Sequence, residues 1–223
     1  MHRRLLTLAP LALGLLLAGC ERSVLMAESD GAVALKAKDY AKARDDYAYA
    51  VDKNPGGLGA RMGLGQALIG LDQPQAARTH LETAYTLAPN NDEVVEALAE
   101  SMLRSGEVDQ MLRLLRLRAE EKGRPSDYIR LGRFAARAKD ADTAQAALLS
   151  AAKIDKGATV EPQLALADFY ESVGDRPQAL RRLGMALFLR PRDAVIQQRI
   201  RALGGVPGPT AEVMPLEASA VER

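Results

Sequence analysis

The chain is poor in the residues that build most enzyme and metal sites. Its 223 residues include no tryptophan, three phenylalanines, two histidines and one cysteine. A single cysteine cannot form an intramolecular disulfide or a cysteine metal cluster. Because His2 lies in an N-terminal segment that we expect to be removed, only His80 remains, and one histidine makes neither a catalytic triad nor a metal site. We therefore expect no catalytic residue, metal, cofactor or small-molecule substrate.

Two short motifs that could indicate enzyme chemistry lack the companions that this chemistry needs. A glycine cluster has no Lys-Ser/Thr ending and follows no predicted strand, so it is not a phosphate loop; it consists of Gly56, Gly57, Gly59, Gly63 and Gly65. The tetrapeptide at 150–153 reads Ser-Ala-Ala-Lys, but the chain has no Lys-Thr-Gly or Ser-Asp-Asn. We interpret Gly65 as a packing position and the other glycines as residues that loosen a turn and the helix after it.

The chain also lacks an excess of charge of one sign. Its formal net charge is +1, and without Arg3 and Arg4 the remainder is near -1. Binding to nucleic acid requires clustered lysines and arginines facing phosphates, so we expect no nucleic-acid partner. Alanine and leucine dominate the apolar residues, and charges of both signs are mixed along the chain. This composition favours amphipathic helices that pack closely.

Residues 1–19 have the layout of a secretory signal peptide. A basic start is followed by an apolar run from Leu5 to Leu17, which Pro10 interrupts and which is short for a permanent membrane span. The run ends in Leu-Ala-Gly-Cys at 17–20, which resembles the bacterial lipobox. That resemblance implies acylation of Cys20 and cleavage just before it. The alternative is an ordinary signal peptide with a chance cysteine.

Lipid attachment at Cys20 would tether the chain to a membrane, since two or more acyl chains give stable anchoring. The next residue is Glu21. In sorting of the enterobacterial type, an aspartate at this position retains a lipoprotein in the inner membrane. We therefore expect a lipid-anchored protein of the outer membrane that faces the periplasm.

The rest of the chain repeats with a period of 34 residues. The matching pairs at this spacing are Gly31 and Gly65, Ala43 and Ala77, Ala50 and Ala84, and Pro55 and Pro89. These positions resemble the tetratricopeptide repeat (TPR), in which small residues mark the crossing of two antiparallel helices. The resemblance implies an all-α solenoid of about five helix-turn-helix repeats with a C-terminal capping helix, because single repeats cannot bury their own apolar face.

The resemblance also sets the boundaries of the units. We expect the solenoid to occupy 20–203, with units at about 24–57, 58–91, 92–124, 125–159 and 160–193 and a cap at 194–203. The tail at 204–223 is rich in glycine and proline, which predicts disorder.

The third unit departs most from the repeat pattern. Met111 and Arg118 occupy the two positions where the other units have alanine. Their bulk should push the second helix of this unit outward. The departure indicates either a degenerate repeat or a special role of this unit.

In the TPR family the first helices of successive units line a concave groove that binds a protein or peptide. The residues that the repeat register places there are Met62, Gln66, Ile69, Glu93, Glu96, Glu100, Leu103, Ser126, Ile129, Arg133, Glu161, Leu164, Asp168 and Glu171. The lysine and asparagine of the family's clamp for a C-terminal carboxylate are absent from these positions. The acidic excess suits a basic or amphipathic partner, although the glutamates of the third unit could also form a solvated helix face.

A lipid anchor followed by TPR units resembles small bacterial lipoproteins that assist envelope machines, such as pilotins and assembly lipoproteins of tight-adherence pili. The resemblance implies a scaffold that holds proteins together during assembly of a pilus or secretion system. The alternative is an adaptor for peptidoglycan hydrolases or other cell-envelope maintenance proteins.

Overall fold

The computed structural model describes residues 22–218, which form eleven helices and no strand. The helices are α1 (Val24–Lys36), α2 (Tyr40–Lys53), α3 (Leu58–Gly70), α4 (Pro74–Leu87), α5 (Asp92–Arg104), α6 (Val108–Lys122), α7 (Pro125–Arg137), α8 (Ala141–Asp155), α9 (Glu161–Ser172), α10 (Arg176–Leu189) and α11 (Ala194–Ala202). Five helix pairs are thus followed by one further helix, and the all-α prediction is confirmed.

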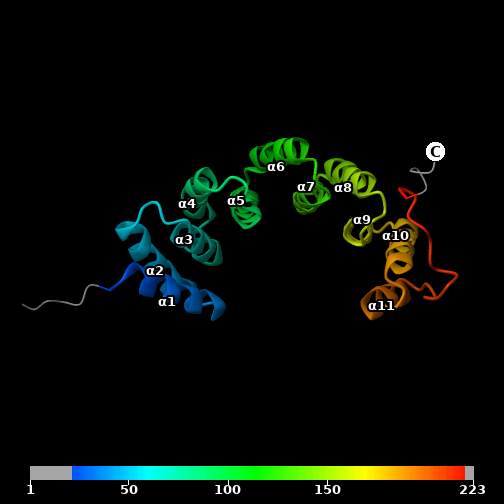
Figure 1. The fold of residues 1–223 in the computed structure, drawn as a ribbon, viewed down its shortest axis with the longest axis horizontal. Helices are drawn as coiled ribbons and strands as arrows, with labels where there is room; N and C mark the ends of the chain where they lie inside the picture. Colours follow the sequence, from blue (N-terminus) through cyan, green and yellow to red (C-terminus); the bar gives the residue numbers. More distant parts are fainter. Residues whose placement is uncertain (1–21, 219–223) are drawn as a thin grey trace, which may run out of the picture.

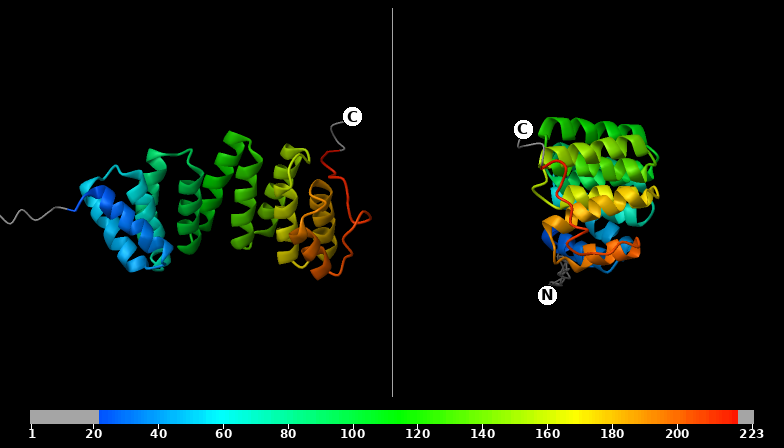
Figure 2. Two further views of the ribbon diagram at one scale, coloured as in Figure 1. Left: turned by 60° about the horizontal axis from the view of Figure 1, so that its bottom comes forward. Right: turned by 90° about the vertical axis from the view of Figure 1, so that its right-hand side faces the viewer.

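The helix pairs stack into an arch (Figure 1). Within this arch α3, α5, α7 and α9 lie on the inner, concave side, and α4, α6 and α8 lie on the outer side. The two further views show the helices side by side, across the long axis of the molecule (Figure 2). The first helices of units two to five therefore face the concave surface, as the repeat register predicts.

The turn inside each repeat has the same hydrogen-bond pattern. The N–H at 39, 73, 107, 140 and 175 donates to the carbonyl five residues earlier, at distances of 2.8 to 3.0 Å. The residue before each of these donors has a positive φ, and it is Lys38, Asp72, Gly106, Lys139 or Gly174. This is the Schellman ending, which satisfies the last carbonyls of a helix. It turns the chain back tightly enough for the second helix to pack on the first.

Small residues allow large side chains to pack at the helix crossings. A Cβ atom on Gly65 would lie 2.5 Å from the Leu81 side chain, and one on Gly132 would lie equally close to Leu148. The interpretation of Gly63 as a loosening residue is wrong. A Cβ there would lie 2.2 Å from the ring of Tyr47 in the preceding unit, so this glycine lets two units approach.

The second helix of the third unit is displaced, as predicted. Met111 is fully buried and Arg118 is 5% exposed, so both large side chains take up space inside the solenoid. As a result, α5 and α6 pack less closely than the helix pair of any other unit.

The prediction of a disordered tail is wrong for residues 204–218. The helix α11 ends in the same Schellman pattern as the first helix of each repeat, with Gly204 at a φ of 72°. No second helix follows within residues 204–218. Instead, the segment runs back along α10 (Figure 2), where the Val213 N–H donates to the carbonyl of Gly184 at 3.2 Å. The carboxylate of Glu217 pairs with the buried Arg182 at 2.7 Å, which offsets the cost of ordering the chain.

The predicted signal peptide at 1–19, the lipidation site Cys20 and the last part of the tail, 219–223, lie outside the described residues. Within 22–218, no helix is both long enough and apolar enough to cross a membrane.

Candidate functional site: the concave surface

Two adjoining hollows lie on the concave side of the arch. The first has a volume of about 530 Å³ and is lined by Gln66, Ile69, Asp92, Glu93, Glu96, Ala97, Glu100 and Arg130. The second has a volume of about 470 Å³ and is lined by Glu96, Pro125, Ser126, Ile129, Arg130, Arg133, Asp155, Thr159, Glu161 and Pro162. Glu96 and Arg130 line both. The two hollows therefore form one groove across the second to the fifth unit, which we call the concave groove.

The concave groove contains most, but not all, of the predicted groove residues. Gln66, Glu93, Glu96, Glu100, Arg133 and Glu161 line it. The predicted residues that line neither hollow are Met62, Leu103, Leu164, Asp168 and Glu171. Asp168 and Glu171 instead pair with Arg199 of the capping helix, at 2.6 Å and 2.8 Å. These two carboxylates fasten α11 to α9.

The acidic residues of the concave groove are mostly paired with arginines. Glu96 accepts from Arg130 at 2.9 Å. Glu100 pairs with Arg104 and Arg137, at 2.8 Å and 2.6 Å, and Glu161 pairs with Arg190 at 3.1 Å. The hydrogen bond from Arg137, helped by Arg104, lowers the pKa of Glu100 despite its partial burial. Arginines thus neutralise three glutamates that line the groove, which the repeat register alone did not predict.

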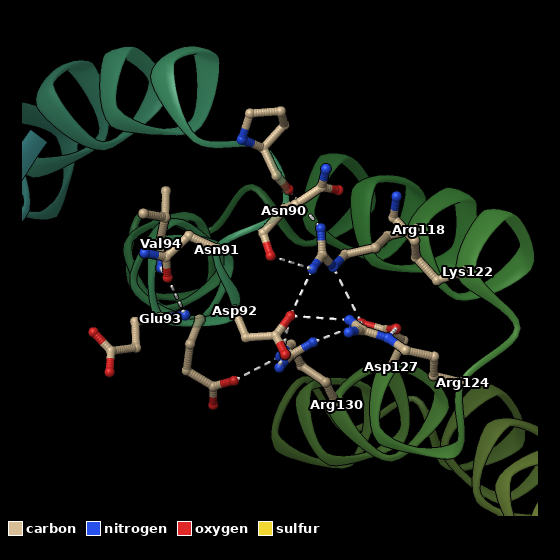
Figure 3. Close-up of polar contacts among 12 residues, drawn as sticks. Asn90, Asn91, Asp92, Glu93, Val94, Arg118, Lys122, Arg124, Asp127 and Arg130 are labelled. Atoms are coloured by element: carbon tan, nitrogen blue, oxygen red, sulfur yellow. Dashed lines mark hydrogen bonds and ion pairs between the residues drawn. The ribbon is translucent and has the colours of Figure 1, made fainter.

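Arg118 is the centre of an ion network that joins three units (Figure 3). Its guanidinium donates to Asp127 of α7 at 3.1 Å and to Asp92 of α5 at 2.5 Å. It also donates to the carbonyls of Pro89 and Asn90, at 2.5 Å and 3.4 Å, in the loop that leaves the second unit. An arginine in place of the usual alanine therefore connects the second, third and fourth units.

Two more arginines complete this network. Arg124 donates to Asp127 at 2.6 Å and to Asp92 at 3.1 Å. Arg130 donates to Asp127 at 2.8 Å and also reaches Glu96 in the groove. The network thus holds the Arg130 guanidinium between the two hollows.

The network lowers the pKa of both aspartates. Burial, the largest single effect on Asp127, would raise its pKa, but hydrogen bonds from Arg124 and Arg118 and their charges outweigh it. At Asp92 burial is likewise outweighed by the hydrogen bond from Arg118, the charge of Arg130 and the hydrogen bond from Arg124. Both carboxylates are therefore ionised at neutral pH and hold the three arginines in place.

The chemistry that the concave groove offers is that of binding. Its apolar surface is supplied mainly by the half-buried Ile69 and Pro125, while Ala97 and Ile129 line it but are largely buried, and charged pairs surround it. Within 22–218, no three His, Cys, Asp or Glu side chains gather closely enough to hold a metal ion. His80 lies half-buried on α4, and burial, helped by the charge of Arg61, lowers its pKa.

Comparisons with known proteins also indicate a tetratricopeptide-repeat fold. A sequence model described as tetratricopeptide repeat matches residues 34–83, and no curated protein matches the chain. The fold is similar to that of a thermophilic TPR protein from Thermus thermophilus, with a TM-score of 0.56, 21% identity, and coverage of 81% of this chain and 98% of that one.

Two further solved structures are similar at comparable levels. A tetratricopeptide repeat protein from Parabacteroides merdae has a TM-score of 0.58 and 16% identity, over 82% of this chain and 73% of that chain. The MamA protein has a TM-score of 0.54 and 17% identity, over 80% of this chain and 94% of that chain. The described part of this chain therefore has the fold of a tetratricopeptide-repeat solenoid, a scaffold suited to protein–protein interaction.

Proposed function

We propose that this protein is a membrane-anchored TPR scaffold, attached by lipid on Cys20 to the outer membrane, that binds protein partners during assembly of a pilus or secretion system. The observation that carries the binding part is the concave groove, where the half-buried Ile69 and Pro125 present apolar surface between paired charges. The anchor rests on the Leu-Ala-Gly-Cys motif at 17–20. The protein acts by holding its partners and not by catalysis.

The arginine partners of the groove glutamates change which kind of ligand we expect. Glu96, Glu100 and Glu161 already have arginine partners, so a purely basic peptide gains little from them. A segment with apolar side chains for the two hollows, and with both signs of charge at its edges, fits better. An amphipathic segment therefore remains as the proposed ligand.

Site-specific photo-crosslinking in cells tests the groove. A photoreactive residue in place of Gln66, which lies in the groove, should crosslink a partner. The matched control is Gln75, which is exposed on the outer helix α4 and should crosslink far less. Equal capture at both positions would count against the groove as the binding surface.

The identity of the crosslinked protein separates the two functions. A component of a pilus or secretion system supports the proposal, and a peptidoglycan hydrolase supports the adaptor function. Fractionation of a Cys20→Ser variant tests the anchor independently. We expect this variant to be uncleaved or released from membranes, and membrane association of the cleaved variant would contradict lipid attachment.

A further inference from the structure

The first helix of the solenoid has an apolar face that no element within residues 22–218 covers. Leu25, Met26 and Val33 are 78%, 60% and 66% exposed. At 100° per residue, these three side chains and the exposed Ser29 and Lys36 lie on one face of α1. We call this surface the α1 face. Helices inside the arch have a neighbour on each flank, whereas α1 begins the row (Figure 1).

The α1 face carries no negative charge. The acidic residues of α1 are Glu28 and Asp30. The carboxylate of Glu28 points toward α3, where it would lie 3.9 Å from a Cβ atom on Gly59. Asp30 is paired with Arg22 at 2.6 Å. The charged group on the exposed face is therefore Lys36, a residue that can extend its ammonium toward lipid phosphates while its stem stays in apolar surroundings.

The position of the face in the chain specifies what can cover it. Cys20 precedes the first residue of α1 by four positions, and four residues span at most about 14 Å. If acyl chains on Cys20 enter a bilayer, the beginning of α1 lies at the headgroup region. Helices that lie in this region bury an apolar face about 5–10 Å deep and place basic residues at its edge.

We infer that the α1 face is a membrane-contacting surface, which lies against the headgroup region of the leaflet that holds the acyl chains of Cys20 and fixes the orientation of the arch relative to the bilayer. This inference rests on the proposed lipid attachment at Cys20. Lipid alone would let the solenoid rotate freely on a short tether, whereas contact through Leu25, Met26 and Val33 restricts it.

Tryptophan fluorescence tests the α1 face because the chain has no tryptophan of its own. The full lipidated protein, carrying Val33→Trp, is placed in vesicles of phosphatidylcholine and phosphatidylglycerol with brominated acyl chains. The matched control is Val195→Trp, because Val195 is also 66% exposed and lies on α11 at the other end of the arch (Figure 1). We expect a blue shift and strong quenching at position 33, and neither at position 195.

A second variant separates the face from the tether. Leu25→Glu and Met26→Glu, added to the Val33→Trp chain, should abolish quenching while the protein still floats with the vesicles. Circular dichroism should be unchanged, since both side chains are exposed.

The remaining outcomes overturn the inference in distinguishable ways. Floating protein without quenching at position 33, or with equal quenching at both positions, contradicts the α1 face. A concentration-dependent blue shift without vesicles would show that a second copy covers this face instead. Failure to float with vesicles would overturn the lipid attachment itself.

Discussion

Two arginines are buried in this solenoid, and they stabilise different parts of it. Arg118 and Arg182 are each 5% exposed. Arg118 is surrounded by carboxylates and carbonyls of neighbouring units, whereas Arg182 donates to Gln163 at 2.9 Å and to Glu217 of the C-terminal segment at 2.7 Å. The Nε of Arg182 has no hydrogen-bond partner among the described residues.

The comparison shows how a repeat protein can use a buried charge. A buried arginine is tolerated only where acceptors satisfy it. Inside the row, the adjacent units supply those acceptors, so Arg118 couples the units to one another. After α11 the described residues form no further helix, and the segment 204–218 folds back to supply Glu217. Arg118 thus connects repeats, and Arg182 holds the segment that closes the last repeat.

The largest expected loss of stability comes from removing Asp127, a buried carboxylate that the three arginines of the ion network share. Asp127→Ala removes the fully buried one of the two carboxylates that Arg118, Arg124 and Arg130 share, and breaking a buried pair in this way costs about 3–5 kcal/mol. Denaturant unfolding measures this loss. The matched control is Asp142→Ala, because Asp142 also lies in the first turn of its helix but is exposed. Equal losses for both variants would contradict the network.

Acid should weaken the same network. The pKa of Asp127 in the folded chain lies below its ordinary value of 3.8. A folded-state pKa below the unfolded one gives stability that is fully present above pH 3.8 and is lost as the pH falls through the folded-state value. Unfolding measured against pH should show this decline. The decline should be shallower in Asp127→Asn, and an identical slope would show that other carboxylates cause it.

The second buried arginine should be more tolerant of losing its partner. Glu217→Ala removes a charged hydrogen bond, which costs about 1–3 kcal/mol, but the freed segment can also move and let water reach Arg182. Hydrogen exchange should therefore rise at 204–218 and stay unchanged near Asp127. Exchange that spreads through all units would mean that the segment stabilises the whole solenoid.

The fold was predicted from the resemblance of the repeating small residues to the tetratricopeptide repeat. Alanines and glycines at a 34-residue spacing mark the helix crossings of the first two units, and the resemblance extends the pattern to the later units, although Met111 and Arg118 replace the alanines of the third. The tail was mispredicted because its composition indicates disorder, while its order depends on Glu217 meeting an arginine 35 positions earlier in the chain. No local pattern contains that pairing.

The candidate groove was only partly predictable for a similar reason. The repeat register places Glu96 and Glu100 on the concave side, and they line the groove. It does not show that Arg130 and Arg137, from the next unit, neutralise them. Asp168 fits the register equally well, yet it pairs with Arg199 of the capping helix. Charge at a repeat surface depends on pairs between units, and these need the three-dimensional stacking.

The smallest expected change in stability comes from Gly184→Ala. It is also the most specific, because its sign depends on whether the C-terminal segment is docked. Gly184 lies inside α10, and a Cβ atom there would be 2.5 Å from the carbonyl oxygen of Ala211. Alanine in place of glycine within a helix normally stabilises by roughly 0.5–1 kcal/mol. Gly184→Ala should therefore destabilise the full chain but stabilise a chain that ends at Leu203, where Ala211 is missing.

The control is Gly59→Ala, because the nearest atom to a Cβ on Gly59 is 3.9 Å away; this change should stabilise both chains. The measurement is thermal unfolding of both substitutions, each made in the full chain and in the chain that ends at Leu203. If Gly184→Ala has the same sign in both chains, the segment does not dock on α10 in solution, and Arg182 must then be satisfied by water.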